Sequence, residues 1–294
     1  MQEFIVEGLG APMRLDRYLR TLSPNLTQGV IEKALRVGDI KVLGSKAESK
    51  RRIQDDDIIT ISDYIKISNK QEYQEATPSI ISLAGKILGE YLILDHPDFF
   101  AIDKPCGVSS QGGSNISLSI DHALQYLNSQ GHDLRIVHRL DKETSGVMLI
   151  AKNRLAATKL GEGFLGHLIK KRYIATVSGP DIPLDGRIES YLAKVGDKVI
   201  EVDEGFKGAK LAITDYKTIS YGVRKVIEFA PQTGRMHQIR CHAAFSLKNP
   251  IVGDKKYGGM AHHRLKLHAK SILIPAEIFG REVLAESDGG LEKW

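Results

Sequence analysis

A short polar segment before an apolar run is the first place where the sequence could support chemistry. In VHRLDKETSGVMLIAKN, residues 137–153, Arg139 and Asp141 flank one leucine and precede a Thr-Ser-Gly turn at 144–146. The apolar run 147–151 predicts a strand. An aspartate in a turn at the mouth of a strand is well placed to face a ligand. An Arg-x-Asp pair is more often a structural ion pair, so these residues alone identify only a candidate.

A second polar cluster lies in PQTGRMHQIRCHA, residues 231–243. It contains four side chains able to form hydrogen bonds within six positions: Arg235, His237, Gln238 and Arg240. The fork of an arginine guanidinium matches a phosphate or a carboxylate better than a lysine ammonium does. The alternative is a polar surface segment, but clustering around Gly234 favours ligand contact.

Histidine and cysteine spacing argues against a metal site or a disulfide. The histidines at 237, 242, 262, 263 and 268 have irregular gaps and no HExxH pattern. Cys106 and Cys241 are far apart and form no CxxC motif, so both are expected to be small buried residues. No metal is predicted.

The positive charge of the chain is concentrated near its start. The formal net charge is +5, and residues 14–52 alone contain ten Lys or Arg against four acidic residues. Such concentration is typical of a polyanion-binding surface, although a solvated helix face is the simpler explanation for a charge run alone. The residues predicted to contact RNA there are Arg14, Arg17, Arg36, Arg51 and Arg52.

Length and composition restrict the class of protein. The chain has 294 residues, of which 42% are hydrophobic and 26% charged, as in ordinary globular proteins of about two domains. No apolar run approaches the roughly 18 residues of a membrane span, and the N-terminus lacks a secretory signal pattern. The sequence therefore predicts a cytoplasmic protein that does not enter a membrane.

Local patterns place these clusters on predicted elements. Apolar residues at helical spacing predict a basic helix over 15–22, and Thr27 can cap a second helix that ends near Gly38. Two short strands around Gly44-Ser45 should follow. The polar stretch 64–86 is interpreted as a linker.

A second domain is predicted over residues 87–294. It should begin with a hairpin in YLILDHPDFFAIDKPCG, and helical and strand patterns then mix without regular alternation. This mixture favours an α+β fold over a doubly wound parallel sheet.

Two family resemblances add to these predictions. RLDRYLR, SPNLTQGVIEKALRVGDIKVLG and DDDIITI resemble the alpha-L RNA-binding module of the S-four type, over residues 12–63. Further along the chain, IDKPCGV, HRLDKETSG, KKRYIATVSG, TGRMHQIRCHA, GDKKYGG and LHAKS occur in the order found in the RluA family of RNA pseudouridine synthases. This second resemblance spans about residues 88–294 and is closer to the RluC branch than to the RluD branch.

The resemblance implies a fold and a set of roles. The fold is a mixed, largely antiparallel central sheet flanked by helices. Asp141 is implied as the catalytic aspartate, Tyr173 as the tyrosine under the base, and Arg240 as the partner of the aspartate. Arg139 would fill the space left by the extruded uridine, and Lys104 would face RNA although Asp103 departs from the family's usual asparagine.

The remaining implied RNA contacts come from the two polar clusters. They are His138, Arg235, His237 and Gln238. The implied substrate is large-subunit ribosomal RNA, and a monomer is expected. Isomerisation of uridine gains and loses no atoms, so no cofactor is predicted.

Two other functions remain as alternatives. A non-catalytic RNA-binding factor for ribosome assembly would need the basic residues, but not Asp141, Tyr173 and Arg240 together. A glycosidase-like hydrolase would need two carboxylates, and the sequence offers only Glu143 close to Asp141. We therefore expect a synthase.

Overall fold

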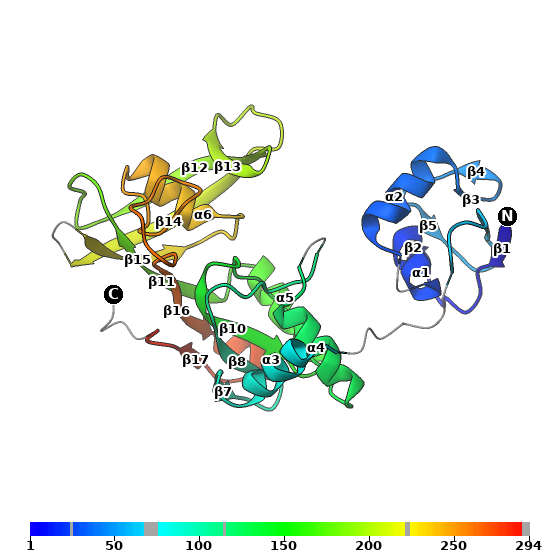
Figure 1. Cartoon of the computed structure of the whole chain (residues 1–294), viewed down its shortest axis with the longest axis horizontal. Helices are drawn as coiled ribbons and strands as arrows, with labels where there is room; N and C mark the ends of the chain where they lie inside the picture. The colour runs from blue at the N-terminus through cyan, green and yellow to red at the C-terminus, as the bar shows by residue number, and fades with distance from the viewer. Residues whose placement is uncertain (24–25, 68–75, 114–115, 221–223, 290–294) are drawn as a thin grey trace. The chain divides into compact units, whose positions relative to one another are not determined.

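The computed structural model describes residues 1–23, 26–67, 76–113, 116–220 and 224–289. The chain forms two compact units, Met1–Glu75 and Ala76–Trp294 (Figure 1). Each unit has a hydrophobic core of its own, so each is described separately.

The first unit packs two helices against short strands. Its strands form a four-stranded sheet of order β1-β6-β3-β4 and a two-stranded pair β2-β5. Thr27 accepts a hydrogen bond from Val30 N at the start of the second helix, and Gly38 ends it with φ +93°. Both predicted helices are therefore confirmed. The elements are β1 Gln2–Ile5, β2 Met13–Arg14, α1 Leu15–Leu22, α2 Gln28–Val37, β3 Ile40–Val42, β4 Ser45–Lys46, β5 Arg52–Ile53 and β6 Ile58–Ile61.

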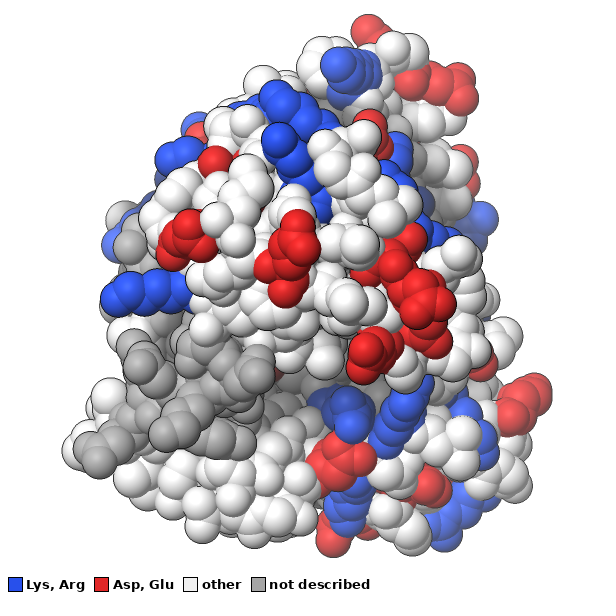
Figure 2. All heavy atoms as spheres, turned by 90° about the vertical axis from the view of Figure 1, so that its right-hand side faces the viewer, with Lys and Arg blue, Asp and Glu red and all other residues white. Residues whose placement is uncertain are grey.

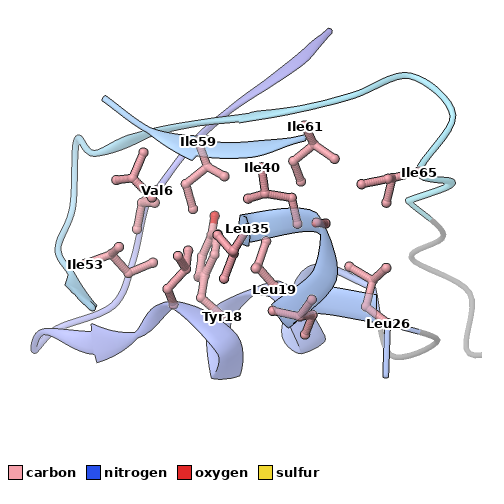
Figure 3. Packing of buried hydrophobic residues seen from close by; sticks show 14 residues of the cluster. Val6, Tyr18, Leu19, Leu26, Leu35, Ile40, Ile53, Ile59, Ile61 and Ile65 are labelled. Carbon is pink, nitrogen blue, oxygen red and sulfur yellow. The ribbon is translucent and has the colours of Figure 1, made fainter. Parts of the chain in front are cut away.

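The core of the first unit extends beyond the predicted boundaries 12–63. Figure 3 shows Val6 and Ile65 packed with Leu19, Leu35 and Ile59 between the helices and the strands. Residues on both sides of the predicted module thus belong to its core.

The predicted linker over 64–86 is wrong in its last part. Residues 68–75 lie outside the described residues, but Pro78–Leu88 forms helix α3, capped by Thr77. Leu83, Ala84 and Ile87 of this helix are buried in the second unit. Their apolar spacing, rather than the polar residues before them, determines the local structure.

The second unit is built on one eleven-stranded sheet. Its main order is β13-β12-β14-β15-β11-β16-β10-β8-β7, with β17 beside β16 and β9 beside β10. All strand pairs are antiparallel except β10 with β16. The mixed, largely antiparallel sheet and the α+β class are therefore confirmed. The strands are β7 Leu92–Asp95, β8 Phe99–Lys104, β9 Arg135–Ile136, β10 Ser145–Ala151, β11 Lys170–Val177, β12 Asp185–Val195, β13 Lys198–Val202, β14 Lys210–Ser220, β15 Lys225–Pro231, β16 Leu267–Ile274 and β17 Val283–Glu286.

Helices cover both faces of one half of this sheet. Met148 of β10 packs in a core with α3 and α4, while its neighbours Val147 and Leu149 pack in a second core with α5. Alternate residues of a strand point to opposite faces, which explains why all seven residues of β10 are buried. The remaining helices of the unit are α4 Ile120–Ser129, α5 Arg154–Leu165, α6 Gln238–Cys241, the π-helical turn His242–Ser246 and α7 Ala276–Phe279.

A close strand contact fixes the start of β10. Gly146 has φ +113°, and a β-carbon there would lie 2.3 Å from the Ala269 carbonyl oxygen of β16. Only glycine fits both the dihedral angle and the space. The turn that follows Asp141 is therefore held directly against the centre of the sheet.

Both signs of charge occur on the face drawn in Figure 2, where lysine and arginine side chains are interspersed with aspartate and glutamate. Within the described residues, no helix is long and apolar enough to cross a membrane.

Candidate active site

Asp141 lies where two cavities meet. It follows β9, and its carbonyl accepts a hydrogen bond from Thr144 N at 3.0 Å, which closes the turn before β10. The cavities have volumes of about 780 Å³ and about 520 Å³, and Asp141 lines both. Its side chain is 31% exposed, so a ligand in either cavity can reach the carboxylate.

The residues on either side of Asp141 are clamped by the loop after β8. Ser110 Oγ donates to Leu140 O at 2.7 Å and accepts from Leu140 N at 3.0 Å. Gly107 N donates to Lys142 O at 2.8 Å. These contacts hold the backbone before and after the aspartate, so the carboxylate is positioned before any ligand binds.

Lys104 belongs to the same clamp, and its predicted RNA-facing role is wrong. Its side chain is fully buried, and Nζ donates to Pro105 O at 2.9 Å, Val108 O at 2.8 Å and Lys142 O at 3.4 Å. Burial lowers the pKa of this amine to about 8, against the opposing effect of nearby acids. Lys104 therefore ties three backbone carbonyls together instead of meeting a phosphate.

Arg240 connects Asp141 to a second, buried carboxylate. Its Nε and Nη2 lie 2.7 and 2.8 Å from the two oxygens of Asp254, while Nη1 lies 3.7 Å from Asp141 Oδ2. The predicted contact between Arg240 and Asp141 is present, but the bidentate partner is Asp254. Asp254, which shares the Arg240 guanidinium with Asp141, is thus a nearby acid that the sequence did not reveal beside Glu143.

Both carboxylate oxygens of Asp254 are occupied by hydrogen bonds within the protein, so Asp254 is not available as a second catalytic acid. Its Oδ1 also accepts from the backbone N of Lys256 at 3.0 Å and of Tyr257 at 3.2 Å, and the residue is 1% exposed. A carboxylate held in this way cannot reach a ligand in the cavities. The geometry thus differs from the paired carboxylates of a glycosidase.

His237 approaches the same oxygen of Asp141. Its Nε2 lies 3.8 Å from Asp141 Oδ2, and its Nδ1 lies 2.8 Å from Tyr257 Oη. Tyr257 Oη also accepts from Val199 N at 3.2 Å, so this hydroxyl is held in place beside His237. Burial lowers the pKa of this imidazole, while the charge of Asp141 opposes that shift. His237 therefore lies between Tyr257 and the catalytic candidate Asp141.

Tyr173 contributes an aromatic wall to the larger cavity. It lies on β11 between Phe229 of β15 and Ala269 of β16, next to a β-bulge at Arg172. Burial raises the pKa of the phenol, and the negative charge of Asp141 raises it further. The hydroxyl therefore remains protonated at neutral pH.

Two predicted RNA contacts have structural partners within the protein. His138 accepts from Leu149 N at 2.9 Å and lies against the Phe164 ring, and burial lowers its pKa to about 3, but it is half-buried and lines the larger cavity, so its contact with RNA stays a prediction. Gln238 is buried and uses both ends of its amide within the protein. The partners of Gln238 are Thr233 Oγ1, Arg235 N, Ile213 O and Thr214 Oγ1.

The two remaining predicted arginines line the cavities. Arg139 is exposed and lines both of them. Arg235 is half-buried, donates from Nε to Leu211 O at 2.8 Å and lines the larger cavity. Both guanidinium groups therefore lie at the site as predicted.

The predicted basic residues of the first unit are mostly exposed. Arg17, Arg36 and Arg52 are exposed, and Arg51 is half-buried. Arg14 is exposed but forms an ion pair with Asp16 at 2.7 Å. Among the residues that the structure describes, no group of three or more His, Cys, Asp or Glu is arranged to hold a metal ion.

Asp254 and Tyr257 are the site residues that sequence reasoning missed. Both lie in GDKKYGG, which carried part of the family resemblance but was given no role. An Asp followed three positions later by Tyr has no chemical signature of its own, and only the fold brings the pair to Arg240 and His237.

Comparison with known proteins defines the class. The second unit contains an RNA pseudouridylate synthase domain, since the model of that family matches residues 98–245. The chain belongs to this family, in its RluA-type group, and is thus an isomerase.

Similar proteins extend over nearly the whole chain. Ribosomal large subunit pseudouridine synthase C of Rickettsia bellii is 45% identical over 93% of both chains. The protein of the same name from Rickettsia prowazekii is 45% identical over 94% of this chain and 93% of its own. The solved structure of human RNA pseudouridylate synthase domain containing 4 has a TM-score of 0.60, with 25% identity over 71% of this chain and 91% of that chain.

Proposed function

We propose that this chain isomerises uridines in large-subunit ribosomal RNA to pseudouridine, with Asp141 as the catalytic residue. The names of the similar Rickettsia proteins support this substrate class. The observation that carries the catalytic assignment is a partly exposed carboxylate at the junction of two cavities, with its backbone clamped on both sides.

The surroundings of Asp141 also support a catalytic role for its carboxylate. Arg240 and His237 both approach it, with their closest contacts at Oδ2, 3.7 and 3.8 Å away. The carboxylate then either attacks the anomeric carbon of the ribose or stabilises its positive charge while the uracil detaches.

The detached base must be held and turned. Tyr173 supplies an aromatic face for stacking in the larger cavity. Because its hydroxyl stays protonated, its proposed part in removing the proton from carbon 5 is that of a relay, which gives up its own proton as it accepts the one from carbon 5. Arg139, exposed beside Asp141, fills the place that the uridine leaves in the RNA. One glycosidic bond breaks, another forms, and a proton moves from carbon 5 to nitrogen 1, so no redox cofactor is required.

The first unit is proposed to bind RNA as an S-four-type module. Its exposed arginines on and around two helices, together with the concentration of positive charge in residues 14–52, support this role. Arg17 and Arg36 are free of ion pairs within the described residues and are the preferred phosphate contacts. The proposal places the enzyme in the cytoplasm, where it acts as a monomer.

Asp141→Asn tests the catalytic assignment. The amide preserves the shape of the side chain and removes its charge, so pseudouridine formation in a large-subunit RNA fragment should be lost while RNA affinity stays within severalfold. Asp203→Asn, at an exposed position between β13 and β14 that lines neither cavity, is the matched control. Single-turnover conversion by Asp141→Asn at the parent rate would exclude Asp141 as the catalytic group.

Deletion of residues 1–75 tests the RNA-binding role of the first unit. The remaining unit has its own core and should fold. RNA affinity should fall, and the slope of log affinity against log salt should flatten by about one for each lost phosphate contact. Equal slopes for the full and shortened chains would contradict the role.

A further inference from the structure

The two cavities at Asp141 have different walls. The larger one contains the aromatic rings of Phe164 and Tyr173 and apolar side chains such as Leu267, beside the cationic groups of Lys171 and Arg235. The smaller one has no Phe, Tyr or Trp in its lining and is richer in cationic groups. Its own cationic and imidazole residues are Lys142, Lys255, Lys256, His263 and Arg264, and it shares Arg139, His237 and Arg240 with the larger cavity.

The smaller cavity carries an excess of positive charge. The acids in its lining are Asp141 and Glu143. Lys256 contacts Asp197, and the charge of Arg240 is balanced by Asp254. The ammonium groups of Lys142 and Lys255 are exposed and form no ion pair within the described part of the chain.

The loop that presents Lys255 is rigidly built. Gly253 has φ +82°, and a β-carbon there would lie 1.9 Å from the Arg264 carbonyl oxygen. Gly253 N donates to Met260 O at 2.8 Å, and Gly259 N donates to Asp254 O at 2.9 Å. These contacts close the loop on itself and on the segment that carries Arg264.

Arg240 ties this loop to the catalytic residue. One side of its guanidinium holds Asp254, next to Lys255, and the other faces Asp141. The cationic wall and the carboxylate are therefore fixed relative to each other by a single buried side chain. Such pre-organisation suits a ligand that must place one atom at Asp141 and charged groups a few ångströms away.

A nucleotide within an RNA chain has this shape. When its anomeric carbon lies at Asp141, the base extends to one side of the sugar and the two phosphodiesters to the other. A cavity with aromatic walls suits the base, and one without aromatic rings but with an excess of lysine and arginine suits the phosphodiesters. The larger cavity therefore corresponds to the base of the nucleotide, and the smaller cavity corresponds to its phosphodiesters.

We infer that the smaller cavity binds the phosphodiester backbone next to the target uridine, with Lys142 and Lys255 as direct phosphate contacts. This inference rests on the proposed function, because it assumes an RNA substrate. It assigns the base and the backbone to separate cavities that meet at Asp141.

The test measures RNA binding in full-length protein carrying Asp141→Asn, so that no turnover interferes. Lys142→Ala and Lys255→Ala are compared with Lys217→Ala, an exposed lysine of β14 that lines neither cavity. Each cavity variant should weaken binding severalfold and reduce the slope of log affinity against log salt by about 0.7 to 1. Lys217→Ala should leave both quantities unchanged.

A modified RNA locates the contact. Methylphosphonate replaces one phosphate at a time on either side of the target uridine and removes its charge. At the phosphate that Lys255 contacts, this change should weaken binding to the parent and abolish the difference between the parent and Lys255→Ala.

The outcomes separate this inference from the proposed function. Unchanged salt slopes for both cavity variants, or no phosphate position that removes the Lys255 effect, would overturn the inference even if the enzyme forms pseudouridine in ribosomal RNA. Failure of the parent enzyme to form pseudouridine in any large-subunit RNA would overturn the proposed function instead.

Discussion

Removing the charge of Asp254 should both destabilise the second unit and impair turnover. In Asp254→Asn, the amide loses the charge-assisted hydrogen bond that Oδ2 accepts from Arg240 Nε at 2.7 Å. The Arg240 guanidinium, 8% exposed as a residue, is then left without its bidentate partner. The new amide N–H₂ would also point at a cation, which cannot accept a hydrogen bond.

The size of the effect follows from burial. Breaking a buried ion pair by removing one partner costs about 3 to 5 kcal/mol. For a unit of this size, 1 kcal/mol shifts the melting temperature by about 2 to 4 °C, so a fall of about 6 to 20 °C is expected. Turnover should fall by about 10²-fold, because Arg240 also faces Asp141 and a displacement of about 1 Å has that effect on positioned groups.

The assay combines thermal melting followed by circular dichroism with single-turnover conversion of an RNA fragment. Asp203→Asn, at an exposed position between β13 and β14, is the control and should leave both readouts unchanged. A melting temperature for Asp254→Asn within 2 °C of the parent value would refute the argument that Arg240 and Asp254 form a structural pair.

Three further predictions follow from residues in the second unit. Tyr173→Phe should retain RNA affinity but lose about 10² to 10⁴-fold in turnover, on structured and unstructured RNA alike. The turnover defect of Arg139→Ala should instead shrink on an unstructured oligomer, whose uridine is already unstacked. The pKa of Lys104 is lowered from 10.5 to about 8 in the folded state, so the unfolded state binds this proton more tightly. The free energy of unfolding should therefore rise between pH 8 and 10.5, relative to that of Lys104→Met. Urea titrations at several pH values measure this difference. Gly146→Ala should cost at least about 2 to 3 kcal/mol in the same titrations, while Gly85→Ala in α3, with open space around it, should be neutral or slightly stabilising.

Periodicity and motif order were sufficient for much of the fold. The apolar stripe of α1, the Thr27 cap of α2 and the turn before β10 are encoded locally, so each was predicted from a few neighbouring residues. The location of Asp141 at a strand's mouth follows for the same reason. Helix α3 was missed because the polar residues before Thr77 obscured its apolar spacing.

The direction of a polar side chain could not be predicted in the same way. Lys104 and Gln238 have residue types that suit RNA, but both donate hydrogen bonds to buried groups of the protein, some of them in distant segments, such as Lys142 O for Lys104 and Ile213 O for Gln238. The pairing of Arg240 with Asp254 likewise depends on a loop closed by Gly253 and Gly259. Only a three-dimensional structure shows such contacts, because they join residues far apart in the sequence.

The strand order has a consequence for how the chain folds. Strand β16 lies between β10 and β11 in the sheet, although it follows both by about a hundred residues in the sequence. During synthesis the facing edges of β10 and β11 therefore stay unpaired until β16 has been made. Long-range strand pairing of this kind is slow, and unpaired strand edges are prone to aggregation. Tyr173 and Asp141 belong to elements on the two sides of that gap. A nascent chain therefore cannot be active before its last central strand is inserted, and a chaperone that shields the gap should increase the yield of active enzyme.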